Sequence, residues 1–123
     1  MKWLLIALIL PLAWCAAPRS ASKQAAPEGK DSIPACIRSL INERNMDIPP
    51  SPPQSITTYT YEGKTVYYFR EGCCDKFNVV YDDSCHLLGA PDGGFTGRGD
   101  GKLPGFFSKA KMIRVVWKED GNK

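Results

Sequence analysis

Apolar side chains recur at helical spacing in residues 33–41, and polar side chains fill the positions between them. The apolar positions are Ile33, Cys36, Ile37, Leu40 and Ile41. This pattern predicts one amphipathic helix with Cys36 on its apolar face. Asp31 and Ser32 are suited to cap the start of the helix, and Pro49 follows its end.

Runs of β-branched and aromatic residues follow and predict β-strands. Residues 56–61 and 64–69 flank the dipeptide Glu62-Gly63, which predicts a β-hairpin. Further strands are expected at residues 76–81, 85–89 and 112–117. We expect the aromatic side chains of the hairpin to pack in a core rather than to form a stacking surface, because cross-strand aromatic pairs commonly stabilise sheets.

A Gly-rich segment, residues 90–102, separates the last two predicted strands, and its composition predicts a long loop without regular structure. A short helical turn is expected at Phe106 and Phe107. Together these elements predict a single α+β domain over residues 33–118, with one N-terminal amphipathic helix packed on an antiparallel sheet of four to five strands and stapled by disulfides. Residues 119–123 are predicted to form a polar tail.

The N-terminus has the pattern of a signal peptide. Lys2 precedes an apolar run at residues 3–10 that is too short to span a bilayer. Residues 1–15 are therefore predicted to direct export to the periplasm, the outer membrane or the medium. Residues 16–32 are rich in Ala, Ser, Pro and Lys and have no hydrophobic periodicity, which predicts a flexible tether.

Cys15 stands at the end of the signal peptide, where residues 12–15 resemble the box of bacterial lipoproteins. Lipidation of Cys15 would anchor the domain to a membrane through the tether. Trp14 argues against lipidation, because the position before such a Cys normally holds a small residue. Lipidation and free secretion therefore both stay open, and no other membrane contact is predicted.

The charge balance of the chain argues against a nucleic-acid partner. The full chain carries 16 basic and 13 acidic side chains, a net charge of +3, and loss of Lys2 with the signal peptide leaves +2. The charges are interspersed, without a basic block of the kind that neutralises phosphates. We expect an envelope or extracellular partner, whose identity the sequence does not give.

Four cysteines downstream of the signal peptide predict two disulfides in an oxidising compartment. They are Cys36, Cys73, Cys74 and Cys85. A bond between the adjacent Cys73 and Cys74 would strain the peptide between them, so we expect Cys36 to bond one of this pair and Cys85 the other. A tight hairpin at residues 77–89 would place Cys85 at its tip, far from both, so either this pairing or the hairpin must be wrong.

Other chemistry at these residues has weak support. A zinc site made of these cysteines and His86 has the wrong ligand spacing, and no C-x-x-C redox motif is present. His86 is the single His, and the chain contains neither G-x-S-x-G nor H-E-x-x-H. We therefore predict no metal, no cofactor and no catalytic residue.

The Gly-rich loop is the candidate binding segment, through Asp92, Thr96, Arg98 and Asp100. A phosphate loop would need Gly where Thr96 stands, and the spacing of the two Asp residues matches no calcium loop. Arg98-Gly99-Asp100 spells an integrin-binding tripeptide, but Gly and Asp in this order are ordinary turn residues. None of these three hypotheses is favoured, and whether the loop binds a ligand stays open.

Several motifs together resemble a known family. They are the P-x-C-I helix start at Pro34, Cys36 and Ile37, the YEGKTVYYF hairpin, Cys73-Cys74-Asp75, the YDDSC turn and the segment APDGGFTGRGDG. Over residues 33–117 the chain resembles an uncharacterised family of small exported bacterial proteins, a domain of unknown function. The resemblance implies export and this fold, and it implies no activity. The resemblance also implies that some relatives carry Cys at the positions of Gly89 and Leu103, a disulfide across the loop that this chain lacks.

These observations favour a non-catalytic binding or interaction module of the cell envelope. The alternative is a small hydrolase or redox enzyme that uses His86 or the Cys73-Cys74 pair. A binding module predicts an exposed surface without an acid or base beside a nucleophile, whereas an enzyme predicts a cleft that joins His86 to one.

Overall fold

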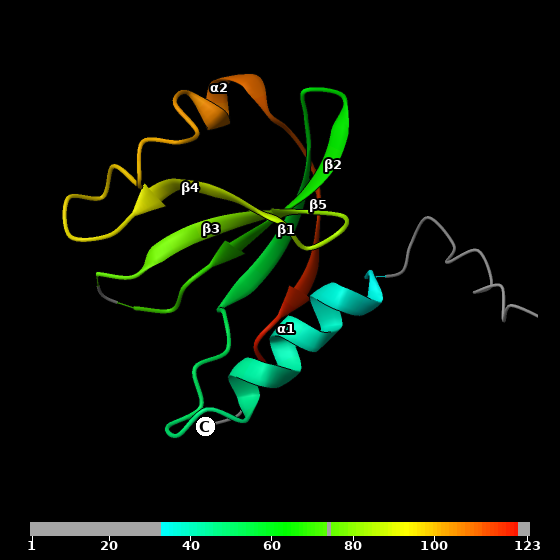
Figure 1. Cartoon of the computed structure of the whole chain (residues 1–123), viewed down its shortest axis with the longest axis vertical. Helices are drawn as coiled ribbons and strands as arrows, with labels where there is room; N and C mark the ends of the chain where they lie inside the picture. The colour runs from blue at the N-terminus through cyan, green and yellow to red at the C-terminus, as the bar shows by residue number, and fades with distance from the viewer. Residues whose placement is uncertain (1–32, 74, 121–123) are drawn as a thin grey trace, which may run out of the picture.

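The computed structural model describes residues 33–73 and 75–120. The predicted signal peptide, the tether, Cys15 and Cys74 lie outside these residues. Seven elements follow one another within them: α1 (Ala35–Asn45), β1 (Ser55–Tyr61), β2 (Lys64–Arg70), β3 (Phe77–Asp82), β4 (Leu87–Gly93), α2 (Phe106–Lys109) and β5 (Lys111–Lys118). The five strands form one antiparallel sheet in the order β4-β3-β2-β1-β5, which confirms the predicted α+β fold (Figure 1).

The sheet is built around the predicted hairpin, which the structure confirms. Glu62 and Gly63 both have positive φ angles, 48° and 76°, as a tight two-residue hairpin turn requires. This turn fixes the register of β1 against β2, with Thr57 opposite Tyr68. Every second residue of β2 therefore points to the same face of the sheet.

Both faces of the sheet carry buried side chains, because α1 and α2 lie on opposite sides of it (Figure 1). On the α1 side, Ile37 and Ile41 pack against Ile56, Tyr67 and Phe69. On the α2 side, buried apolar residues from the strands meet those of the segment that follows the Gly-rich loop. This second cluster comprises Tyr61, Val66, Tyr68, Val80, Leu103 and Phe106. The hairpin aromatics thus pack in the two cores, as predicted.

Helix α1 begins later than its sequence suggests. Its N-cap is Pro34, which makes no side-chain capping bond, and the carbonyl of Pro34 accepts the N–H of Arg38 at 3.1 Å. Asp31 and Ser32, which the sequence suggests as caps, lie outside the described residues. No helix within residues 33–73 and 75–120 is long and apolar enough to cross a membrane.

The Gly-rich segment is more regular than its composition predicts. Residues 90–93 belong to β4, which runs from Leu87 to Gly93, so the expectation of a strand at 85–89 followed by an irregular loop is wrong. The chain then folds back along the edge of β4, where Gly99 N–H donates to Gly93 O at 3.1 Å and Asp100 N–H donates to Ala90 O at 3.0 Å. A Cβ on Gly99 would lie 2.0 Å from Ala90 O, so this close return depends on glycine.

Candidate functional site

An open groove of about 560 Å³ lies on the α2 side of the sheet. We call it the sheet groove, and it combines aromatic, apolar and charged side chains. It is lined by Ser55, Thr57, Tyr59, Tyr68, Arg70, Asn78, Asp92, Phe107, Met112, Val115 and Lys118. Helix α2 covers only part of this face, and all five strands contribute residues to the groove beside it.

The pairing of β1 with its two neighbours arranges the groove in three rows across the sheet. Tyr59 pairs with Met112 of β5, and on its other side with Val66 of β2. Thr57 pairs with Tyr68 and Val115 in the next row. In the third row, Ser55 pairs with Arg70 and Lys118. The rows therefore change from aromatic and apolar at one end of the groove to polar and cationic at the other.

Two β-bulges put the β5 residues of these rows on one face. The register of β5 against β1 shifts between Ile56 and Thr57 and again between Thr58 and Tyr59. As a result Met112, Val115 and Lys118, three residues apart in sequence, all lie opposite groove residues of β1. Bulges commonly re-aim side chains in this way, and a strict two-residue alternation would have sent Val115 to the other face.

Three aromatic rings form the wall of the groove next to α2. Tyr68 and Phe107 meet edge to face with ring centroids 5.5 Å apart, and Tyr59 contacts both at 6.1 and 6.3 Å. Tyr68 is buried, whereas the side chain of Phe107 is 49% exposed. Phe107 thus offers apolar surface to a ligand from a cluster that holds its position.

The phenol of Tyr68 is fixed by Asp92. Its hydroxyl donates to the Asp92 carboxylate, with both oxygens at 3.0 Å. Burial, and then the nearby Asp92 charge, raise the pKa of Tyr68 well above its ordinary value, and the same two causes raise the pKa of Tyr59. Both phenols are therefore protonated at neutral pH, and that of Tyr68 donates to Asp92.

The cationic end of the groove contains Arg70 and Lys118, one on each side of Ser55. Both side chains are exposed, and neither forms an ion pair within residues 33–73 and 75–120. An adjoining hollow of about 290 Å³ shares these three residues and adds Gln54 and Glu119. The N–H of Glu119 donates to Gln54 O at 3.0 Å, which ties the chain after β5 to the sheet.

The predicted binding loop is divided by the structure. Asp92 lies in the sheet groove, whereas Thr96 and Arg98 are exposed at the loop tip, where Arg98 N–H donates to Thr96 Oγ1 at 3.4 Å. Asp100 Oδ1 accepts the N–H of Lys102 at 3.0 Å, and backbone hydrogen bonds from Ala90 and Lys102 lower the pKa of its carboxyl. The four residues therefore do not form one site.

The two ends of the Gly-rich loop lie side by side. A Cβ on Gly89 would be 3.2 Å from Leu103 Cγ. In this chain Gly89 has a φ of 151°, which L-residues rarely adopt, and Leu103 packs in the buried cluster below α2.

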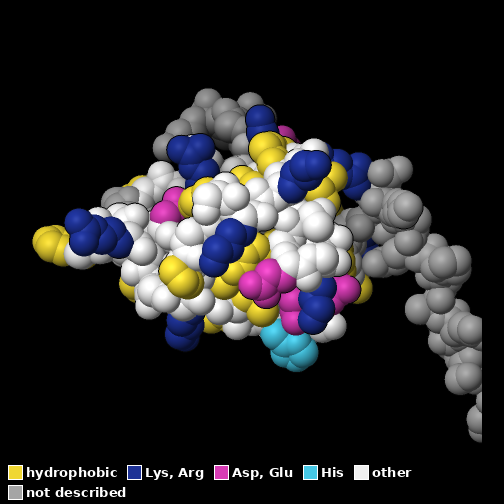
Figure 2. All heavy atoms as spheres, turned by 90° about the horizontal axis from the view of Figure 1, so that it is seen from above, with side chains coloured by type: hydrophobic (Ala, Val, Ile, Leu, Met, Phe, Trp, Pro, Cys, Tyr) yellow, Lys and Arg dark blue, Asp and Glu magenta, His cyan; other side chains and the backbone are white. Residues whose placement is uncertain are grey.

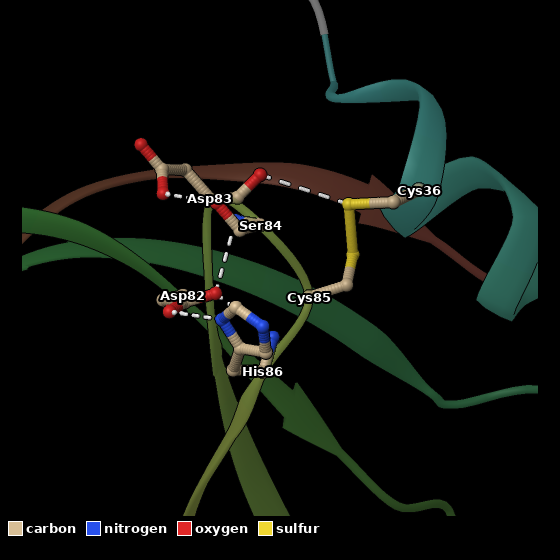
Figure 3. Close-up of polar contacts among 6 residues, drawn as sticks. All are labelled: Cys36, Asp82, Asp83, Ser84, Cys85 and His86. Atoms are coloured by element: carbon tan, nitrogen blue, oxygen red, sulfur yellow. Dashed lines mark hydrogen bonds and ion pairs between the residues drawn. A yellow bond between two sulfur atoms is a disulfide. The ribbon is translucent and has the colours of Figure 1, made fainter.

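A disulfide joins Cys36 to Cys85, with 6.0 Å between the two Cα atoms (Figure 3). The prediction that Cys36 bonds Cys73 or Cys74 is therefore wrong. The hairpin of β3 and β4 does place Cys85 at its tip, and that tip lies against the first turn of α1. Cys73 is disulfide-bonded as well. Zinc binds cysteine as a thiolate, so Cys36 and Cys85 cannot be zinc ligands while they are bonded to each other.

His86 belongs to the turn that presents Cys85. Asp82 Oδ1 accepts the N–H groups of Ser84 and His86 at 2.9 and 2.8 Å, and Asp82 Oδ2 lies 3.1 Å from His86 Nδ1 (Figure 3). The backbone N–H of His86 is the largest cause of the lowered pKa of Asp82. The Ser84 hydroxyl donates to Asp83, not to the imidazole. The arrangement is that of a turn stabilised by an Asp side chain.

The exposure of His86 also fits a residue of a surface turn. Its side chain is 77% exposed, and Figure 2 shows the imidazole projecting beside a group of acidic side chains. The Lys and Arg side chains on this face are scattered rather than gathered into one basic patch (Figure 2). Within the part of the chain that the structure describes, no three His, Cys, Asp or Glu residues are grouped to hold a metal ion.

Sequence reasoning missed most of the sheet groove. Of the groove residues, Asp92 alone was singled out as a candidate. The sequence does hold one signal for the cationic end of the groove. A basic residue directly follows two of the predicted strands: Arg70 after residues 64–69 and Lys118 after residues 112–117. Only the register shows that they occupy the same row.

Comparisons with known proteins place the chain in a family without extending its function. Searches of the curated proteins and of the solved structures found no match. A family model described as a domain of unknown function (DUF6970) matches residues 42–119, which extend from the second half of α1 to the end of β5. The chain therefore belongs to this family, and the matched residues include all five strands and α2.

Proposed function

We propose that this protein is an exported, non-catalytic binding module and that the sheet groove is its binding surface. The observation that carries this proposal is the groove itself. Three rows of paired residues form a floor on a rigid sheet, and α2 leaves that floor open. Sites on strands hold their side chains more firmly than sites on loops, so such a floor suits recognition.

The residues of the groove support binding rather than catalysis. Its titratable groups are phenols with raised pKa values, an Asp that accepts a phenol hydrogen bond, and two cations. A nucleophile mechanism needs a base within hydrogen-bond distance of the nucleophile. In the groove the Tyr68 hydroxyl does contact a carboxylate, that of Asp92, but burial and the Asp92 charge raise the pKa of this phenol and so disfavour its nucleophilic phenolate form. His86 does not line the groove.

A fragment screen tests this function. Ligand-observed NMR with neutral, anionic and cationic fragments on the purified protein should find hits that are lost in Met112→Trp, because the indole would fill the groove from the edge strand. Lys111→Trp is the matched control. Lys111 precedes Met112, pairs with Thr60 and faces away from the groove. Hits that survive Met112→Trp and disappear in Lys111→Trp, or a screen without hits, would contradict the proposal.

Export is the second part of the proposal. It rests on the N-terminal apolar run after Lys2, and the Cys36–Cys85 disulfide is compatible with it because disulfides persist in oxidising compartments. Cell fractionation of the full-length protein should recover it outside the cytoplasm. Cys15→Ser should then release the protein from membranes if Cys15 is lipidated, and unchanged fractionation would leave secretion as the route.

A further inference from the structure

We propose that the sheet groove selects ligands that carry a carboxylate on an apolar or aromatic group. This inference rests on the proposed function and names the ligand class of the same groove. It is argued from the contrast between the two ends of the groove and from the positions of their charges.

The cationic end has two charges available for an anion. Arg70 and Lys118 lie on the strands that flank β1, so their backbones are about 10 Å apart across Ser55. Both side chains are exposed and long enough to converge on one anion above Ser55, whose hydroxyl can donate a further hydrogen bond. An arginine guanidinium pairs with a carboxylate through two parallel hydrogen bonds.

The acidic residues near Arg70 and Lys118 form no ion pair with them within the described residues. Asp92 is engaged by the Tyr68 hydroxyl at 3.0 Å, and the carboxylate of Glu119 makes no ion pair with Arg70 or Lys118 within the described residues. Arg44, by contrast, is paired with Glu71 on the other face of the sheet. An incoming anion can therefore approach both groove cations without displacing a protein carboxylate.

The other end of the groove provides apolar surface beside this charge. The exposed fractions of the Met112, Phe107 and Val115 side chains are 56, 49 and 39%. Covering apolar area of this kind with a ligand removes it from water and so favours binding. A ligand that places its carboxylate by Ser55 would lay its apolar part over Val115 and Phe107, so one molecule can use both ends.

The edge of β5 is a poorer candidate for a ligand. An extended peptide could in principle add to the outer edge of this strand. The two bulges break the regular hydrogen-bonding row there, and Lys111 and Lys118 place charges along the strand. Both features are ways in which sheets protect an edge from pairing.

Phenylpropionate, phenylpropionamide and acetate form a probe series that separates charge from apolar contact. In NMR chemical-shift titrations of the purified protein, phenylpropionate should perturb the groove amides. Phenylpropionamide and acetate should each bind at least about tenfold more weakly. Arg70→Gln and Lys118→Gln should each weaken phenylpropionate about tenfold and leave phenylpropionamide unchanged. Lys111→Gln, which changes the net charge equally from the opposite face, should have no effect.

Equal binding of the acid and the amide, or phenylpropionate binding that is unchanged in Arg70→Gln and Lys118→Gln, would overturn the carboxylate preference. The same holds if the fragment screen finds only neutral or cationic groove ligands. In each of these cases the groove still binds, so the proposed function stands. A screen with no groove ligand of any charge would remove the proposed function itself.

Discussion

The two faces of the sheet differ in how completely they are covered. On one face, an eleven-residue helix lies over the strands and is tied by Cys36–Cys85 to the β3–β4 turn. On the other face, the four-residue α2 and the segment before it cover one end and leave the sheet groove open. Both faces contain buried apolar clusters, but only the α2 side also keeps aromatic and cationic side chains accessible. Under the proposed function, the disulfide-tied face stabilises the sheet and the open face binds the ligand.

The largest test of this contrast is removal of the disulfide on the covered face. Cys36→Ser with Cys85→Ser should lower the free energy of unfolding by about 4 kcal/mol, because the bond closes a loop with a sequence separation of 49. Urea denaturation measures the change. The groove should still bind its ligands in the folded fraction. Binding should therefore decrease only as much as the folded fraction of the protein decreases. A stability equal to that of the parent protein would show that α1 is held by packing alone.

Truncating one buried and one exposed aromatic residue compares the faces directly. Phe69 is fully buried on the α1 side, where Tyr81 and Arg44 contact its ring, so Phe69→Ala should cost about 3 to 4 kcal/mol. Phe107→Ala should cost about 1 kcal/mol, because half of its side chain is already exposed, and it should weaken groove binding. Thermal melts and fragment titrations report the two effects separately, and equal destabilisation by both changes would contradict the contrast.

Two glycines test the contact between the Gly-rich loop and the edge of β4. Gly97 and Gly99 have almost the same φ, 71° and 72°, but a Cβ has free space at Gly97 and clashes with Ala90 O at Gly99. Gly97→Ala should cost about 1 kcal/mol from the left-handed backbone alone. Gly99→Ala should cost about 3 kcal/mol, because the loop must also leave the edge of β4. Similar melting temperatures for the two variants would mean that this loop does not depend on its contact with β4.

A smaller effect is expected at the hydrogen bond inside the groove. Tyr68→Phe removes the donor to Asp92 and should cost about 1 to 2 kcal/mol at neutral pH. Because the pKa of Tyr68 is raised in the folded state, its contribution is fully present below pH 10, the ordinary value, and declines at higher pH as the unfolded chain loses this proton first. The parent protein should therefore lose stability more steeply above pH 10 than Tyr68→Phe, and parallel pH profiles would exclude this role.

The sequence predicted the elements that depend on local signals. The β1–β2 hairpin follows from Glu62-Gly63 between two β-branched runs, and α1 follows from the spacing of Ile37 and Ile41. The disulfide partner of Cys36 could not be predicted, because it depends on the β3–β4 hairpin carrying Cys85 to the first turn of α1. The conflict between that hairpin and the expected pairing was visible in the sequence, and the hairpin was the correct assumption.

The groove could not be predicted because it depends on two bulges and on long-range register. In the sequence, Met112, Val115 and Lys118 look like an irregular strand, since their spacing of three fits neither a strand nor a helix face alone. Bulges at two places in β5 make this spacing useful by setting all three residues opposite β1. Loop composition instead drew attention to Thr96, Arg98 and Asp100, of which none lines the groove.

Residue-resolved NMR mapping of a bound fragment tests the central claim most directly, namely that the face opposite α1 is the binding surface. Titration of the purified protein with a screening hit should shift the amides of Thr57, Tyr59 and Val115 and leave those of Ile37 and Ile41 unchanged. Shifts concentrated on α1, or at the loop tip around Phe95, with an undisturbed groove would contradict it.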